Sequence, residues 1–145
     1  MAARLAALVD TNILVYTVDP DEVAKGHTAA TLMRDGARAG SLKLAHQVVV
    51  EFVSVVTRSR RGATPLLTVP AAVRAATRLL ESYEVLYPTL AVVELALSGV
   101  TQYQLSWYDA HLWAYAEHFS LDTLYSEDFQ HGRKYGGVRV INPFA

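Results

Sequence analysis

The chain has 145 residues, of which 52% are hydrophobic and 19% charged, so residues 1–145 are expected to form one domain with a substantial core. This composition excludes disordered and fibrous proteins. The formal net charge of -1 lacks the basic signature of many small nucleic-acid-binding modules, although it does not exclude a nucleic-acid partner. The absence of cysteine excludes disulfides, zinc–thiolate sites and thiol nucleophiles and fits a reducing compartment.

No segment of the sequence has the length and apolarity of a membrane span. The apolar run at the start of the chain meets Asp10 after only a few residues, so it is too short for an export signal and far too short for a transmembrane helix. We therefore expect a soluble, cytoplasmic protein with no membrane partner.

Short apolar runs alternate with helical patterns in the first part of the chain. Asp19 followed by Pro20 predicts a helix start, because a capping residue followed by proline suits the first helical turn. The valine-rich stretch after His46 is too long and too often broken by polar residues for a strand, so it predicts a buried helix. The elements expected here are strands at 5–9 and 42–46 and helices at 11–16, 20–38 and 47–60.

The rest of the chain continues this alternation. Thr68 before Pro70 starts a helix whose inward face we expect to contain Val73, Ala76, Leu80 and Tyr83. A strand at 84–86, helices at 90–98 and 106–119, and strands at 123–125 and 138–141 follow. Helices alternating with short apolar strands predict an α/β fold with a mostly parallel sheet and helices on both faces.

Two carboxylates follow predicted strands. Asp10 ends the first strand, at the edge where open parallel sheets form ligand crevices, although it would also suit the N-cap of the next helix. Asp128 comes just after the strand at 123–125, with Ser126 available to hydrogen-bond a neighbouring carboxylate. Taken alone, this second cluster is typical of a polar turn.

Two more carboxylates lie in predicted helices. Glu51 interrupts an apolar stretch, where an unpaired charge is costly, so we expect an active-site or metal-binding role; a structural ion pair with Arg58 is the alternative. Asp109 shares a helical face with Leu112 and Ala116 and is expected to point toward the core or a cleft. Aspartate in a first helical turn is also favoured by the helix dipole.

Together, Asp10, Glu51, Asp109 and Asp128 form the convergent set that a carboxylate site requires. Such groups repel one another unless a divalent cation is present, and oxygen-only ligands select Mg²⁺ or Mn²⁺. These ions bridge to phosphate oxygens and activate water, which predicts phosphodiester hydrolysis. The other charged residues sum to +3, so the surface around an acidic pocket is compatible with a polyanion.

Other polar residues give weaker signals. The five histidines lack the close spacing of a metal site, so we interpret them mainly as surface or satisfied polar residues; they are His27, His46, His111, His118 and His131. Two basic clusters are either phosphate contacts or solvated faces; they are Arg58, Arg60 and Arg61, and Arg133 with Lys134. Four tyrosines would either stack on unpaired bases or pack in the core; they are Tyr103, Tyr108, Tyr125 and Tyr135.

The segments Asp10-Thr11-Asn12, Glu51, Trp107-Tyr108-Asp109-Ala110 and Leu124-Tyr125-Ser126-Glu127-Asp128 resemble the acidic signature of PIN-domain ribonucleases. The length and the closing Val138-Arg139-Val140-Ile141-Asn142-Pro143-Phe144 resemble, more narrowly, the VapC toxins of type II toxin-antitoxin modules. The resemblance implies a three-layer α/β/α domain and a Mg²⁺- or Mn²⁺-dependent endoribonuclease. It also implies a VapB-type antitoxin, a homodimer, and structured RNA substrates such as transfer RNA or ribosomal RNA loops.

By the same resemblance, Asp10, Glu51, Asp109 and Asp128 would be the catalytic, metal-coordinating acids, while Thr11, Asn12 and Ser126 would orient them or their waters. Two alternatives stay open: a PIN-like nuclease of RNA processing outside a toxin-antitoxin module, and a catalytically silent interaction domain. A phosphatase or a DNA flap-type nuclease is disfavoured because the chain shows no inserted substrate-gripping domain. The response to metal separates these classes, since a structural ion changes the melting temperature without turnover.

Overall fold

A computed structural model describes residues 6–145 of the chain, so Leu5, the first residue of the first predicted strand, lies outside the described residues. A six-stranded sheet has the order β3-β2-β1-β4-β6-β5. The strands are β1 (Ala7–Val9), β2 (Leu42–Ala45), β3 (Glu84–Leu86), β4 (Thr123–Tyr125), β5 (Lys134–Tyr135) and β6 (Val138–Ile141). All neighbouring strands pair in parallel except β5, which is antiparallel to β6.

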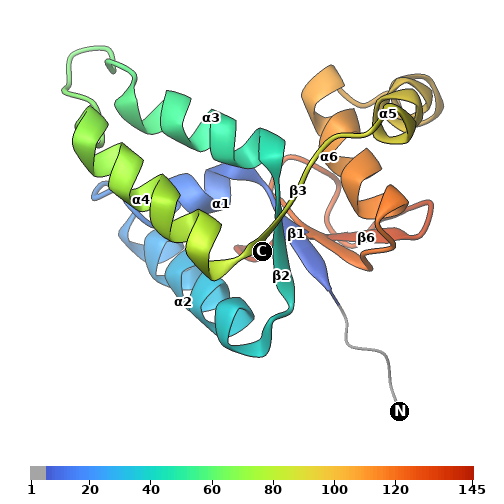
Figure 1. Cartoon of the computed structure of the whole chain (residues 1–145), viewed down its shortest axis with the longest axis horizontal. Coiled ribbons are helices and arrows are strands. Elements are labelled where there is room, and N and C mark those ends of the chain that lie inside the picture. Colours follow the sequence, from blue (N-terminus) through green and yellow to red (C-terminus); the bar gives the residue numbers. More distant parts are fainter. Residues whose placement is uncertain (1–5) are drawn as a thin grey trace.

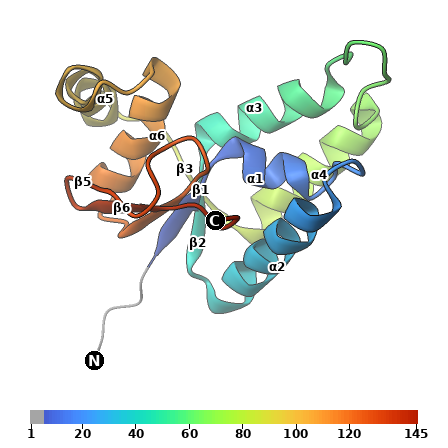
Figure 2. The ribbon, with the colours of Figure 1, turned by 180° about the vertical axis from the view of Figure 1, so that it is seen from behind.

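Helices cover both faces of this sheet. They are α1 (Thr11–Tyr16), α2 (Val23–Ala39), α3 (His46–Thr57), α4 (Val69–Ser82), α5 (Leu90–Tyr103) and α6 (Trp107–His118). Helices α1 to α4 lie on one side and α5 and α6 on the other, as Figure 1 and the reverse view in Figure 2 show. The predicted three-layer α/β/α fold is therefore confirmed. None of the helices in residues 6–145 is long and apolar enough to span a membrane.

The central strands explain why their sequences read as continuous apolar runs. Leu8 and Val9 in β1, Leu44 in β2 and Leu124 in β4 are all fully buried. A strand covered by helices on both faces buries both of its alternating side-chain rows, which removes the polar positions that a half-exposed strand would show. Burial of these strands also holds the candidate site in place, because candidate acids follow the ends of the strands.

The predicted start of the second helix is wrong. Helix α2 begins at Val23 rather than at Pro20, and its N-cap, Glu22, makes no side-chain capping bond. The Asp19 carboxylate instead accepts a hydrogen bond from the Asp21 backbone N–H, at 3.0 Å. A side chain that bonds the backbone two residues ahead favours a turn over a helix, which explains the delayed start.

The C-terminal half differs from the prediction in two places. Helix α5 continues past Ser98 to Tyr103, because Gly99 lies against the α6 helix rather than ending α5: a Cβ atom at Gly99 would stand 2.8 Å from the Trp113 ring. Strand β5 was missed, since its two residues are too few to show an alternating pattern. It pairs with β6 through a turn in which Gly136 has a φ of 59°.

The predicted inward face of α4 is also wrong in part. Val73 and Leu80 are 54% and 52% exposed, whereas Ala72 is buried and Leu79 packs against the core. Two adjacent stripes of this helix are apolar, so the periodicity alone does not tell which of them faces the sheet. In α6 the prediction holds for Leu112 and Ala116, which are both buried.

We expect Gly36→Ala to destabilise the fold by about 1–2 kcal/mol, even though alanine is the better helix former. A Cβ at Gly36 would stand 2.2 Å from the Cδ1 atom of the buried Leu42 side chain, so α2 and β2 would have to separate. Urea denaturation measures the change in the free energy of unfolding. Leu42→Ala on the same background should remove most of this clash, and a Gly36→Ala variant as stable as the wild type would contradict the close approach.

Candidate active site

Two neighbouring strands bring Asp10 and Ser126 together at the carboxyl edge of the sheet. Val9 of β1 pairs with Tyr125 of β4, so the residues that follow them stand side by side. The Ser126 hydroxyl donates a hydrogen bond to Asp10 Oδ2 at 2.6 Å, and the Thr11 N–H donates to Asp10 Oδ1 at 2.7 Å. The chain leaves β1 toward β2 and reaches β4 on the opposite side, which is the type of switch point where open sheets bind ligands.

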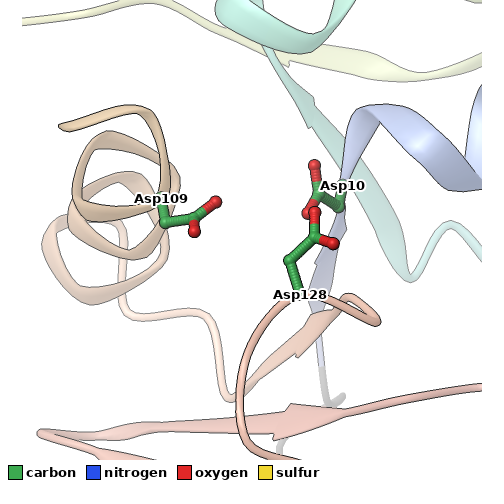
Figure 3. A group of neighbouring side chains, drawn as sticks. All are labelled: Asp10, Asp109 and Asp128. Carbon is green, nitrogen blue, oxygen red and sulfur yellow. The ribbon is translucent and has the colours of Figure 1, made fainter. Parts of the chain in front are cut away.

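Two further aspartates converge on Asp10. The Asp128 backbone N–H donates to Ser126 Oγ at 3.1 Å, and the Asn12 side-chain amide lies 3.5 Å from Asp128 Oδ2. Asp109 lies in the first turn of α6, where Ser106 caps the helix. Asp10, Asp109 and Asp128 each offer a carboxylate oxygen, and these three atoms lie within 4.8 Å of one another (Figure 3).

Glu51 lines the same cavity from α3 but is not part of this close group of three aspartates. Its Oε2 atom accepts a hydrogen bond from the Thr11 hydroxyl at 2.9 Å. Its Oε1 atom is buried and has no hydrogen-bond partner among residues 6–145. The alternative ion pair with Arg58 is not formed within the described part of the chain. A buried carboxylate oxygen without a donor is energetically costly, so the described residues do not by themselves compensate the Glu51 carboxylate.

Burial and mutual repulsion both act on these acids. The pKa of Asp10 is raised to about 7, chiefly by burial; the nearby Asp128 and Asp109 carboxylates also raise it, while the hydrogen bonds from Ser126 and Thr11 lower it. Burial is also the main cause of the raised pKa of Asp109, with Asp128 and Glu51 adding to it. A positive charge placed among these carboxylates would relieve both effects.

The acids line a cavity of about 570 Å³. Its walls are Asp10, Thr11, Asn12, Gln47, Val50, Glu51, Ser54, Val55, Arg58, Tyr108, Asp109, Leu112 and Asp128. Every charged side chain that could ligate a cation here is a carboxylate. Sites with only oxygen ligands suit hard divalent ions. The Glu51 Oε1 atom supports this fit, because a nearby cation would compensate a buried carboxylate oxygen that has no hydrogen-bond donor among residues 6–145.

A second network holds the turn that carries Asp128. The Glu127 carboxylate accepts hydrogen bonds from the Tyr16 hydroxyl and from Lys25 Nζ, the latter at 2.9 Å. Glu127 raises the pKa of Lys25 to about 12. Sequence reasoning missed this network, and also missed Gln47, whose amide donates to the Tyr108 carbonyl at 3.1 Å across 61 positions of sequence. No local pattern marks contacts between residues so far apart in the chain.

Several other candidates from the sequence have structural partners. His131 accepts a hydrogen bond from the Asn142 N–H at 2.9 Å, which fixes the chain after β6. The Arg133 guanidinium lies 4.5 Å from the centre of the Tyr135 ring. Arg60 pairs with Asp21 at 3.6 Å, whereas Arg58 lines the acidic cavity. Arg58 is thus the member of the basic clusters that the fold brings to the acids.

The fold of this chain is similar to the folds of several solved structures. Among solved structures, the chain resembles VapC20 of Mycobacterium tuberculosis, a toxin that cleaves the sarcin-ricin loop: the TM-score is 0.65 and the identity 22%, over 85% of this chain and 90% of that one. It resembles a toxin-antitoxin complex from Klebsiella pneumoniae with a TM-score of 0.66 and 18% identity, over 95% and 98% of the two chains. FitAcB from Neisseria gonorrhoeae gives 0.69 and 18%, over 95% and 98%.

No curated protein matches the chain by sequence. The family model of the PIN domain does match, over residues 7–136, which include all four candidate acids and the three polar residues beside them. This match covers most of the chain and spans the strands and helices that carry the acidic cavity. The chain therefore belongs to the PIN domain family.

Proposed function

We propose that this protein is a metal-dependent endoribonuclease that hydrolyses RNA phosphodiester bonds. The observation that carries the proposal is the convergence of carboxylate oxygens of Asp10, Asp109 and Asp128 within 4.8 Å, in a cavity that Glu51 also lines. The cavity is open to solvent on the side where Asp128 is exposed, so a polymer has access to it. Membership of the PIN family favours nuclease activity over a purely structural role for these acids.

The proposed metal ligands are the three aspartates, with Glu51 completing the acidic set, and the proposed ion is Mg²⁺ or Mn²⁺. Such an ion, when bound, supplies positive charge for phosphate oxygens and lowers the pKa of water. Thr11 orients Glu51, Asn12 orients Asp128, and Ser126 orients Asp10 through the hydrogen bonds described above. These three residues therefore position the acids instead of acting on the substrate themselves.

The chain's own residues supply the remaining steps of the proposed reaction. Glu51, at the cavity wall, is the proposed base that takes a proton from the attacking water. As that proton leaves, the water oxygen bonds to phosphorus, one P–O ester bond breaks, and the leaving oxygen takes up a proton from solvent. Arg58 at the cavity wall offers a cationic contact for a phosphate of the RNA backbone.

We further propose that the protein is the toxin of a toxin-antitoxin pair, with a VapB-type antitoxin as its partner. The support is the likeness to chains from toxin-antitoxin complexes of several bacteria, over nearly the whole length of both proteins. Cytoplasmic location, a homodimer and a structured RNA target such as transfer or ribosomal RNA belong to the same proposal. A PIN nuclease of RNA processing, without an antitoxin, is the alternative.

Incubation of the purified protein with total RNA tests the proposed activity. We expect discrete products in Mg²⁺ or Mn²⁺ and none in EDTA, because the acids alone repel the phosphate. Cleavage in EDTA, or no cleavage with either ion, would reject the metal-dependent mechanism. Inducing the gene in a growing host, alone and together with a candidate antitoxin gene, separates a toxin from a processing enzyme: only a toxin arrests growth in a way that an antitoxin reverses.

Ser126→Ala should weaken metal binding about tenfold, which is the usual effect of losing a group that orients a ligand. The Ser126 hydroxyl lowers the pKa of Asp10 and fixes its Oδ2 atom, so its loss leaves the carboxyl more often protonated and less well aligned. Calorimetric titration with Mn²⁺ at pH 7 measures the change. Because protonation causes part of the loss, the defect should shrink at pH 8.5; a defect independent of pH would contradict this explanation.

A further inference from the structure

A second cavity, of about 330 Å³, adjoins the acidic one. Gln47 and Tyr108 line both cavities, and the Gln47 amide donates to the Tyr108 carbonyl at their boundary. The remaining wall includes His46, Trp107 and His111. A volume of this size is at the lower end of the range of small-molecule pockets, about 300–1,000 Å³. The second cavity is therefore a direct extension of the candidate active site.

The walls of the second cavity are aromatic and exposed. The Trp107 side chain is 42% exposed and Tyr108 is 68% exposed, although large aromatic side chains usually gain most from burial. The planes of Trp107 and His111 are perpendicular, with ring centres 4.0 Å apart, so they form a corner. Exposed ring faces beside a nuclease site are the surfaces on which unstacked bases bind.

The residues that line the second cavity carry both hydrogen-bond donors and acceptors. The Trp107 indole N–H is a donor, and the Tyr108 hydroxyl can donate or accept. Gln47 uses its amide nitrogen on the Tyr108 carbonyl, which leaves its Oε1 atom as an acceptor. No lysine or arginine lines this cavity. A mixed set of donors and acceptors without a cation suits the edge of a nucleobase better than a phosphate.

We propose that the second cavity binds an unpaired nucleobase of the RNA strand, next to the phosphate that is cut. This proposal rests on the proposed function. With the phosphate at the acids, the strand crosses the boundary at Gln47 and Tyr108 and places a neighbouring base against Trp107. Because any base has a face to stack and an N–H group or amino group is common to all of them, the subsite selects single-stranded RNA over duplex RNA.

A second copy of this chain is the competing occupant. Exposed apolar side chains on α5, Leu90 and Leu97, enlarge the apolar surface of this side of the molecule. The continuity with the acidic cavity through Gln47 and Tyr108 favours the base, because an RNA strand bound at the acids passes directly over this surface.

The test measures binding of a fluorescein-labelled, single-stranded 2′-O-methyl RNA hexamer in Ca²⁺, a hard cation with oxygen ligands that offsets the charge of the acids, and gel electrophoresis checks that the hexamer stays intact. We expect Trp107→Leu to weaken binding about tenfold and Trp107→Phe to retain most of it, because stacking needs an aromatic face. Tyr108→Leu should weaken binding independently of Trp107. Leu97→Ser, exposed on α5 and outside the cavity, is the matched control and should bind like the wild type.

Intrinsic fluorescence gives a second readout. The chain has two tryptophans, and Trp113 is only 3% exposed, so quenching by the added RNA reports on Trp107. Unchanged affinity in Trp107→Leu, or no binding by the wild type, overturns the proposal. So does sedimentation that shows a wild-type dimer which Trp107→Leu dissociates, because this face then joins two copies. Binding that depends on Trp107 in a protein that cleaves no RNA would retain the subsite and reject the nuclease function.

Discussion

Replacing Asp10 by asparagine should lower the rate of RNA cleavage by at least about 10³-fold while making the metal-free protein more stable. Asp10 is the most buried of the acids, at 8% exposure, and it lies where β1 ends between β2 and β4. Asparagine keeps the size and one acceptor oxygen, so it retains one of the two hydrogen bonds that Ser126 and the Thr11 N–H donate, but it removes the charge that would hold a cation. The loss of activity and the gain in stability thus have the same physical cause.

The sign of the stability change follows from the pKa of Asp10. Burial raises this pKa to about 7, whereas an unfolded aspartate titrates near pH 3.9, so the folded state holds its proton more tightly. The contribution of Asp10 to stability is therefore greatest below about pH 4 and is lost as the pH rises to about 7. Asp10→Asn removes this loss, and we expect its melting temperature in EDTA to exceed that of the wild type by about 5 °C at pH 8.

Two controls make the Asp10→Asn result specific. Asp122→Asn changes an exposed aspartate outside the cavity and should alter neither cleavage nor melting temperature. The gain in melting temperature of Asp10→Asn should also be smaller at pH 5 than at pH 8. A less stable Asp10→Asn protein at pH 8 would mean that Asp10 contributes to the fold chiefly through its hydrogen bonds. The buried charge of Asp10 would then not be destabilising, contrary to this prediction.

Divalent metal should stabilise the wild type more strongly at pH 8 than at pH 5.5. At the lower pH the raised pKa of Asp10 keeps this carboxyl largely protonated, so a cation must displace its proton to bind, and the raised pKa of Asp109 acts in the same direction. At a metal concentration 100 times the dissociation constant, binding stabilises the fold by about 2.7 kcal/mol, which raises the melting temperature by roughly 5–10 °C.

Thermal unfolding in Mn²⁺ and in EDTA at both pH values measures this linkage. Asp10→Asn should lose most of the metal-induced shift at pH 8, whereas Asp122→Asn should keep it. A shift of equal size at both pH values would show that the ion binds elsewhere. A metal-induced shift in a protein that cleaves no RNA would favour a catalytically silent domain with a structural ion.

The sequence predicts the layers of the fold well because both sides of the sheet are covered. Complete burial makes the central strands read as apolar runs, and Asp10 stands out because it ends one of them. The orientation of α4 is not predictable in this way, since two adjacent stripes of that helix are apolar. The start of α2 depends on whether Asp19 caps a helix or closes a turn, and the local sequence allows both.

The candidate site, like the fold, could be predicted from the sequence only in part. The four acids are visible because charges at strand ends and in apolar helical stretches need an explanation. Their convergence depends on the register of β1 with β4 and on the approach of α6, which only the fold supplies. The contacts of Lys25 with Glu127 and of Gln47 with Tyr108 span 102 and 61 positions, so no local pattern announces them.

The central claim is that the acids around Asp10 hold the ion on which RNA cleavage depends. The most direct test measures Mn²⁺ binding by calorimetry and the Mn²⁺ dependence of cleavage in the same protein at pH 8. We predict one half-saturating concentration for binding and for cleavage, and the loss of both in Asp10→Asn. Cleavage that persists in Asp10→Asn, or that saturates at a concentration unrelated to binding, would contradict the claim.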